Sequence, residues 1–438
     1  MTAVAVYSET IASAATTTST SYVDVTDAMT GLSASTKYLV IAQACVGGND
    51  ANATFGFQII ERDTGETDLV VSNSEMIREP SNTTKPSDYT WSGIVTTRSG
   101  GADSGFMFQQ KAVSSGTAKV DYVSIVAIDL SELTEGSDYF VSDDATNVRH
   151  TTSAVKRNDY TIDAADAKDN TWLLLGFMRT DANNTANSAE IVFQQTTTSG
   201  GTETMYTALF EAEDTTEQLQ HVMSYGKAFT IDEDVMLALW SRDDGGFLGA
   251  NEYMASSIIG LRLSAFEQYW AGYSATPDLD NGPSFNDRHT SRITPDTSGT
   301  IVLIGTMIAN LQATGRRIFQ RLQIDDTSIP NTLLESTHSC RTYDNTDLIP
   351  VNVVATHSVT ADTIYPFAYQ FKENYSGTGV NESGFVVFST ELAATTIPAY
   401  NVIAAQTNAA GDVIAQSFQA GDVKTQSTQA GDVATETI

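Results

Sequence analysis

Three blocks of sequence recur in one fixed order along this chain, and that recurrence limits the folds open to it. A strand-like apolar block appears at 38–42, 172–176 and 302–305. A closing apolar block appears at 125–130, 258–263 and 385–392. Between them lies a Phe-Gln pair, at Phe57-Gln58, Phe193-Gln194 and Phe319-Gln320. Intervals of roughly 130 residues match a common domain size. The chain is therefore predicted to be three copies of one domain.

We place the domain boundaries just past the first two closing blocks, near Leu133 and Ala265. The predicted domains are 1–133, 134–265 and 266–393, followed by a tail of 394–438. Each copy begins within a few residues of the end of the previous copy, which leaves no room for a flexible linker. The three copies are expected to form a stiff rod or a compact triangle. A triangle would let one polypeptide imitate a trimer at a pseudo-threefold position.

Alternation of apolar and polar residues dominates the strand-like segments. Phe367, Tyr369 and Phe371, for example, fall on one face of a strand. Turn-rich clusters of Gly, Asn, Asp and Ser separate the segments, as at 99–101, 199–201, 243–246 and 376–379. The pattern predicts an all-β chain of three tandem antiparallel β-sandwich domains, jelly-roll-like, plus an extended repetitive C-terminal tail. Long helical periodicity is absent, and only 217–223 is read as a brief turn of helix.

The charge balance argues against a nucleic-acid partner. The formal net charge is -31, because 54 Asp and Glu residues are balanced by only 23 Lys and Arg residues. Such a surface repels phosphate backbones. The longest apolar stretch, 172–178, is too short to span a bilayer, so no membrane insertion is expected. The first residues carry no cationic segment, so no secretory leader is expected either, and synthesis and assembly in a cytoplasm are expected.

No pattern in the sequence predicts catalysis, a cofactor or a metal site. None of the five histidines lies in a known metal or nucleophile motif; they are His150, His221, His289, His338 and His357. Cys45 and Cys340 have no disulfide or metal spacing and are expected to be buried. The segment 278–282 opens like a calcium loop but lacks the closing Glu, so we read it as a turn. The chain is predicted not to be an enzyme.

Aromatic residues and one recurring tripeptide are considered as candidate binding sites. Trp270 and Tyr273 lie in the irregular opening of the third copy and are candidate glycan contacts, because sugar rings stack on flat apolar faces. Trp91 and Trp240 are further candidates for such a contact, but Trp240, like Trp172, lies within a strong strand pattern and is expected in the core. Arg-His-Thr recurs at 149–151 and 288–290 without a counterpart in the first copy, and we attribute it to duplication.

The tail repeats Ala-Gly-Asp-Val every ten residues. Gly-Asp favours turns, and the apolar residues are too few for a core, so the free tail is expected to be disordered. Extended segments of this kind can add strands to the exposed sheet edge of a neighbour. The candidate assembly contacts are Gly411, Asp412, Val413, Gly421, Asp422, Val423, Gly431, Asp432 and Val433.

Together these features resemble the structural proteins of tailed-phage virions. The resemblance rests on tandem β-domains, scarce Lys, the lack of catalytic motifs and the repetitive tail, and no diagnostic motif carries residues over. It implies a non-enzymatic fibre, spike, head-decoration or tail subunit, anchored in the virion by its tail. The implied partners are other virion proteins and copies of the same chain, with a host surface glycan as a further candidate. A surface adhesin or tandem carbohydrate-binding protein is the leading alternative, and a polysaccharide depolymerase the third.

Overall fold

The computed structural model of this chain consists almost entirely of β-strands. Its described residues contain one short 3-10 turn, η1 (Leu263–Ala265), and no α-helix, so none of them belongs to a helix that could cross a membrane. The structure describes residues 3–11, 13–49, 53–63, 65, 68–78, 87–99, 104–146, 148–149, 153–163, 170–182, 188–197, 201–211, 219–231, 234–243, 251–274, 284–311, 318–326, 329–338, 348–373, 378–393, 404–407 and 413–416.

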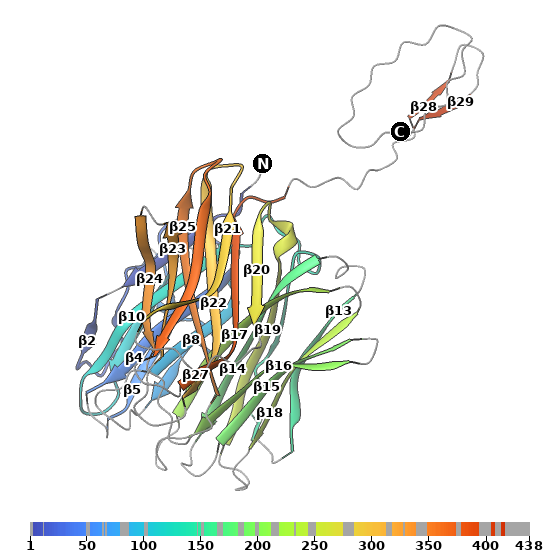
Figure 1. Cartoon of the computed structure of the whole chain (residues 1–438). Helices are drawn as coiled ribbons and strands as arrows, with labels where there is room; N and C mark the ends of the chain where they lie inside the picture. Colours follow the sequence, from blue (N-terminus) through green and yellow to red (C-terminus); the bar gives the residue numbers. More distant parts are fainter. Residues whose placement is uncertain are drawn as a thin grey trace.

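The strands form three successive groups along the chain (Figure 1). The first unit contains β1 (Val6–Ile11), β2 (Ala15–Thr17), β3 (Val23–Asp24), β4 (Lys37–Gly48), β5 (Phe55–Arg62), β6 (Asp68–Val70), β7 (Met76–Arg78), β8 (Ser87–Thr96), β9 (Gly105–Ala112) and β10 (Ala118–Asp129). The second contains β11 (Tyr139–Asp144), β12 (Val148–Arg149), β13 (Val155–Ile162), β14 (Asn170–Ala182), β15 (Ser188–Thr197), β16 (Thr202–Glu211), β17 (Leu219–Ile231), β18 (Val235–Asp243) and β19 (Asn251–Arg262). The third contains β20 (Tyr269–Ser274), β21 (Asn286–Ile293), β22 (Gly299–Leu311), β23 (Ile318–Asp326), β24 (Ile329–His338), β25 (Leu348–Val359), β26 (Tyr365–Glu373) and β27 (Thr378–Ser389).

Each unit pairs two antiparallel sheets with the same connectivity. We call one sheet the inner sheet; in order it is β1-β10-β4-β8, β11-β19-β14-β17 or β20-β27-β22-β25. The other is the outer sheet, in order β3-β9-β5-β6, β13-β18-β15-β16 or β21-β26-β23-β24. Numbered along each unit, the eight main strands give 1-8-3-6 and 2-7-4-5, which is jelly-roll connectivity. The predicted all-β antiparallel class is confirmed. The predicted division near Leu133 and Ala265 falls between the strand groups, and its exact limits stay a prediction.

The apolar blocks at 38–42, 172–176 and 302–305 lie on β4, β14 and β22, the third strand of each inner sheet. Their composition follows from burial on both faces. In β4, Tyr38 and Val40 pack into the core of their own sandwich, whereas Leu39 and Ile41 belong to a different cluster on the opposite face. A strand buried on both faces reads as a continuous apolar run rather than an alternating one. The block at 38–42 is therefore continuous.

The Phe-Gln pairs do not mark equivalent positions in the first and third units. Phe57 is fully buried in the sandwich core of the first unit. In the third unit Gln320 takes the inward position, while Phe319 is only partly buried. The inward amide is satisfied, because Tyr369 Oη donates to Gln320 Oε1 at 2.6 Å and Gln320 Nε2 donates to the Asn352 carbonyl at 2.9 Å.

The predicted turn of helix at 217–223 is wrong from Leu219 onward. Residues 219–231 form β17, which pairs along its whole length with β14. A continuous ladder of backbone hydrogen bonds to a neighbouring strand outweighs a weak local preference for helix. In the tail, β28 (Ala404–Thr407) and β29 (Val413–Gln416) pair with each other as antiparallel strands.

Candidate functional site

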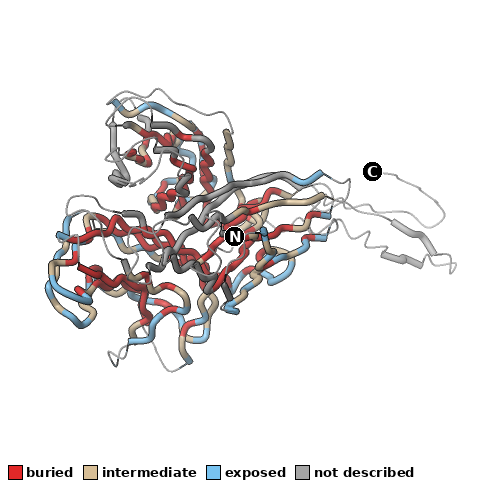
Figure 2. The backbone as a smooth tube through the Cα atoms, turned by 90° about the horizontal axis from the view of Figure 1, so that it is seen from below, coloured by how far each residue is buried: buried red, intermediate tan, exposed pale blue. Residues whose placement is uncertain are grey.

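The three inner sheets meet in one apolar cluster, which we call the axial core. Twelve of its members occupy the same places in each unit, namely two alternate positions on the third strand and two on the last strand. They are Leu39, Ile41, Val126 and Ile128 in the first unit, Leu173, Leu175, Ile259 and Leu261 in the second, and Val302, Ile304, Val386 and Phe388 in the third. None is more than 3% exposed. The units are thus arranged in pseudo-threefold fashion. Figure 2 shows long buried stretches of chain through the interior of the molecule.

Contacts between the units close a ring. Trp91 of the first unit meets Phe177 of the second edge to face, with ring centroids 6.1 Å apart. Thr171 of the second unit and Tyr269 of the third share a hydrogen bond of 3.1 Å between their hydroxyl groups. Ser124 of the first unit donates to the backbone carbonyl of the third unit's Val354 at 2.8 Å. Each unit therefore contacts both others, which excludes a rod.

A buried polar layer follows the axial core along the strands. Gln43 and Ser124 are fully buried and lie opposite each other in the register of β4 and β10. Thr306 of the third unit is 2% exposed and lies opposite Asn352. Such groups need directional hydrogen bonds, as the one from Ser124 to the third unit shows. That bond restricts how the first and third units can be rotated or shifted against each other.

The segment 390–393 ties the three units together at one end. Val4 donates its backbone N–H to the Thr390 carbonyl at 2.8 Å, and Ala3 bridges Glu391. The same segment is hydrogen-bonded to the junction between the second and third units, where the Ala393 backbone N–H donates to the Ala265 carbonyl at 2.9 Å. The end of the third jelly roll thus clamps the beginning of the first.

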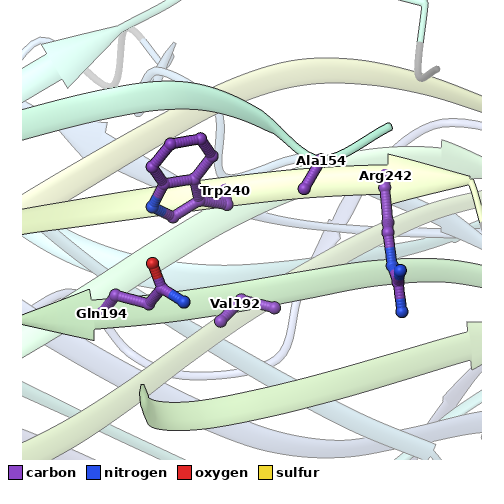
Figure 3. Close-up of a pocket in the computed structure, with 5 residues that line it drawn as sticks. All are labelled: Ala154, Val192, Gln194, Trp240 and Arg242. Atoms are coloured by element: carbon purple, nitrogen blue, oxygen red, sulfur yellow. The ribbon is translucent and has the colours of Figure 1, made fainter. Parts of the chain in front are cut away.

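A pocket lies on the outward face of the second unit's outer sheet. It has a volume of about 320 Å³ and is lined by Ala154, Val192, Gln194, Trp240 and Arg242. Figure 3 shows these side chains on three adjacent strands: Trp240 and Arg242 lie on β18, Val192 and Gln194 on β15, and Ala154 directly before β13. An aromatic ring, an aliphatic floor and two planar polar groups therefore converge on one hollow.

The two tryptophans expected in the core differ in position. Trp172 is fully buried, as expected. Trp240 is only partly buried and lines the pocket, so its expected core position is wrong. Leu237 and Leu239 face the sandwich core, and strand alternation puts Trp240 on the opposite face. That two-residue period was the sequence signal for the pocket wall.

The predicted glycan contacts Trp270 and Tyr273 do not form one platform. They are three residues apart on β20, and strand alternation therefore sends them to opposite faces of the sheet. Trp270 is partly buried and packs against Phe385, with ring centroids 5.6 Å apart. Glycan binding by either residue alone stays a prediction.

The Arg-His-Thr segment of the third unit lies on β21, beside Trp270. His289 Nε2 is 2.9 Å from Ser383 Oγ, and its ring stacks on Tyr369 at 6.3 Å. Burial, together with the neighbouring Arg288, lowers the pKa of His289 to about 4. In the second unit, His150 and Thr151 lie outside the described residues.

This buried histidine predicts a loss of stability in mild acid. Between the ordinary histidine pKa of about 6.5 and the folded value, the unfolded chain binds a proton that the folded chain does not. Stability is therefore complete above the ordinary pKa and falls as the pH drops through that window, by roughly 2–3 kcal/mol near pH 4.5. We expect His289→Gln to remove that share of the pH dependence in urea unfolding measured at pH 7 and pH 4.5. An unchanged difference between the two pH values would contradict this origin.

The remaining predicted site residues fall mostly beyond the described part of the chain. Of the candidate assembly contacts, Val413 begins β29; the other eight, Gly411, Asp412, Gly421, Asp422, Val423, Gly431, Asp432 and Val433, lie outside the described residues, as does 278–282. Cys45 is buried, as expected, and Cys340 lies outside the described residues. Where the structure describes side chains, no three His, Cys, Asp or Glu residues gather as metal ligands would.

Comparison with known proteins finds only weak similarity, and only to solved structures. No protein-family model matches the chain, and no curated protein matches it. A structure reported as the triple jelly roll fold and turret assembly in an archaeal virus has 9% identity and a TM-score of 0.17, covering 87% of this chain and 92% of that chain. The T13 IBDV viral particle protein has 9% identity and a TM-score of 0.23, covering 89% and 78%. The tandem CBM22 domains of Paenibacillus barcinonensis Xyn10C have 8% identity and a TM-score of 0.19, covering 59% and 91%. These scores are too low to support a function.

Proposed function

We propose that this protein is a non-enzymatic structural subunit of a viral particle, in which three jelly rolls in one chain take the place of a trimer. The observation that supports the proposal is the axial core, because twelve apolar side chains from equivalent positions face one another instead of solvent. A single jelly roll with that face exposed would carry a large apolar patch, which marks an interaction surface.

Joining the three units covalently has two physical consequences. Separate chains lose translational and rotational freedom when they associate, whereas linked units meet at a high effective concentration. The sequences of linked units can also diverge from one another, so that the outward face of each unit carries different side chains. Both properties suit a part that occupies one position in a larger assembly and presents distinct surfaces there.

We assign the attachment to the assembly to the tail, residues 394–438. The ten-residue repeat supplies turns and short strand-forming segments, and β28 and β29 already pair in this way. Strand addition to a neighbour's sheet edge uses backbone hydrogen bonds and needs few specific side chains. Within virions, we favour a tailed-phage fibre, spike, head-decoration or tail subunit.

The role is tested by comparing particles with and without this protein in electron microscopy. We expect particles that lack the gene to lose a protrusion, or their stability, and particles made with a chain ending at residue 393 to show the same defect. Circular dichroism of the shortened chain should match that of the full chain, because the jelly rolls end before the tail. Normal, fully decorated particles in both cases would contradict the proposal.

A surface adhesin or carbohydrate-binding protein is the second candidate. The pocket beside Trp240 favours it, because an aromatic wall with planar polar neighbours is the usual form of a sugar site. Binding to host cells by the purified chain, without any particle, would support this alternative over a purely structural role.

A further inference from the structure

The three outer sheets can be compared at one equivalent spot, because their strand registers coincide. In the second unit Lys156 lies opposite Trp240, immediately before a bulge in β13. In the third unit Asp287 lies opposite Gln370, immediately before the same kind of bulge in β21. In the first unit the corresponding pair is Asp24 and Gln109. The residue two positions before each of Asp24, Lys156 and Asp287 then forms the edge of the spot; these residues are Tyr22, Ala154 and Phe285.

In the first unit this spot is sealed by the protein's own side chains. The ring of Tyr22 lies under the ammonium group of Lys111, 4.1 Å from the ring centroid. Beside it, Gln109 Nε2 donates to Asp24 Oδ1 at 2.9 Å, and Gln58 Nε2 donates to Gln109 Oε1 at 2.8 Å. An aromatic ring, a cation and a hydrogen-bonded polar network therefore occupy this position.

The third unit seals the spot in the same way. The ring of Phe285 lies 4.1 Å from Lys372 Nζ and 4.1 Å from the guanidinium carbon of Arg321. The polar network is repeated as well, since Gln370 donates to Asp287 and Arg321 donates to Gln370. Two of the three units therefore fill this position with the same kinds of side chain.

Among the described residues of the second unit, the corresponding positions carry different side chains. Ala154 stands where the other units have Tyr22 and Phe285, and Arg242 stands where they have a lysine. The Asp–Gln pair is replaced by Lys156 and Trp240, so the polar network is replaced by an aromatic wall. The hollow of about 320 Å³ borders Ala154, where the other two units carry an aromatic ring. It lies at the small end of ligand sites, which span roughly 300–1,000 Å³.

The lining indicates the chemistry of the occupant. An indole packs well against the C–H face of a sugar ring, and the Gln194 amide can both donate to and accept from hydroxyl groups. Arg242, which lies opposite Glu190 in the strand register, provides a planar guanidinium that suits a carboxylate. Lys156 lies next to Trp240 and is ion-paired with Asp159. A cation in the pocket lining stands out in a chain with 23 Lys and Arg residues against 54 acidic ones.

We propose that this pocket binds one acidic sugar residue, a hexuronic or sialic acid, of a glycan. The ring stacks on Trp240, the carboxylate pairs with Arg242, and the hydroxyl groups bond Gln194. The proposal stands apart from the particle role, since a structural subunit and a free adhesin could both carry the site.

The test is saturation-transfer NMR and calorimetric titration of the full chain with glucuronic acid and N-acetylneuraminic acid, with glucose as the neutral comparison. We expect saturable binding of at least one acidic sugar and at least about tenfold weaker binding of glucose. Ala154→Phe, which restores the plug of the third unit, should abolish binding. Trp240→Ala should weaken it at least about tenfold.

Two controls keep the result decisive. Ala154 is exposed at the edge of its sheet, so the thermal transition of the Ala154→Phe chain should match that of the original chain. Arg242→Gln should remove the preference for the acidic sugar while leaving weak binding of the ring. No saturable binding, equal binding of glucose, or binding that survives Ala154→Phe would each overturn the proposal.

Discussion

Replacing Leu175 with aspartate is expected to unfold all three jelly rolls together. Leu175 is 1% exposed and lies in the axial core, among apolar side chains of the other two units. A carboxylate there has no partner, and burying an unpaired charge costs several kcal/mol, comparable with the whole stability of a domain, about 5–15 kcal/mol. The measurement is hydrogen exchange of the outer strands β5 and β23, which lie in the first and third units.

The matched control is Leu69→Asp, the same change at a leucine that is 50% exposed on β6. We expect the free energy of unfolding of this variant to lie within about 0.5 kcal/mol of that of the original chain, as is usual for surface substitutions. Protection lost only in the second unit of the Leu175 variant would show that the units fold independently and that the axial core is merely a contact.

Trp172→Ala is expected to lower the free energy of unfolding by about 3–5 kcal/mol, the usual loss for a buried aromatic. Trp172 is fully buried, and its ring lies 5.5 Å from that of Phe140. Phe140 in turn stacks on Tyr160 at 4.0 Å and covers Gly260, where an added Cβ would lie 2.0 Å from the ring. Removing the indole therefore leaves a cavity that its tightly held neighbours cannot fill. Urea unfolding measures the loss.

Trp240→Ala provides the comparison of equal size within the same unit. Because Trp240 is on the outward face, its removal is expected to cost about 1 kcal/mol or less. Equal losses for the two variants would contradict the assignment of Trp172 to the core and Trp240 to the pocket.

The sequence was sufficient to predict the repeated architecture but not its closure into a ring. The apolar blocks at 38–42, 172–176 and 302–305 identify strands, and their continuous character already indicates burial on both faces. The partner on the second face is another unit, up to 230 residues away in the Ser124–Val354 bond. No local pattern specifies such a contact, which is why rod and triangle remained open.

For a related reason the sequence offered Trp240 as one of several candidate glycan contacts but did not indicate the rest of the candidate site. Trp240 and Ala154 are 86 positions apart in the sequence, and their proximity depends on the pairing of β13 with β18 and on a bulge within it. Alternation with Leu237 and Leu239 indicated an outward Trp240, but nothing in the sequence indicated that Ala154 replaces an aromatic plug. That inference required the registers of all three outer sheets.

Calorimetric unfolding of the full chain most directly tests whether three jelly rolls form one body around a shared core. We predict one transition for the three units, with a van't Hoff enthalpy close to the calorimetric enthalpy, because separating any unit exposes the axial core of the others. Three resolved transitions, each with the enthalpy of a single unit, would contradict the account.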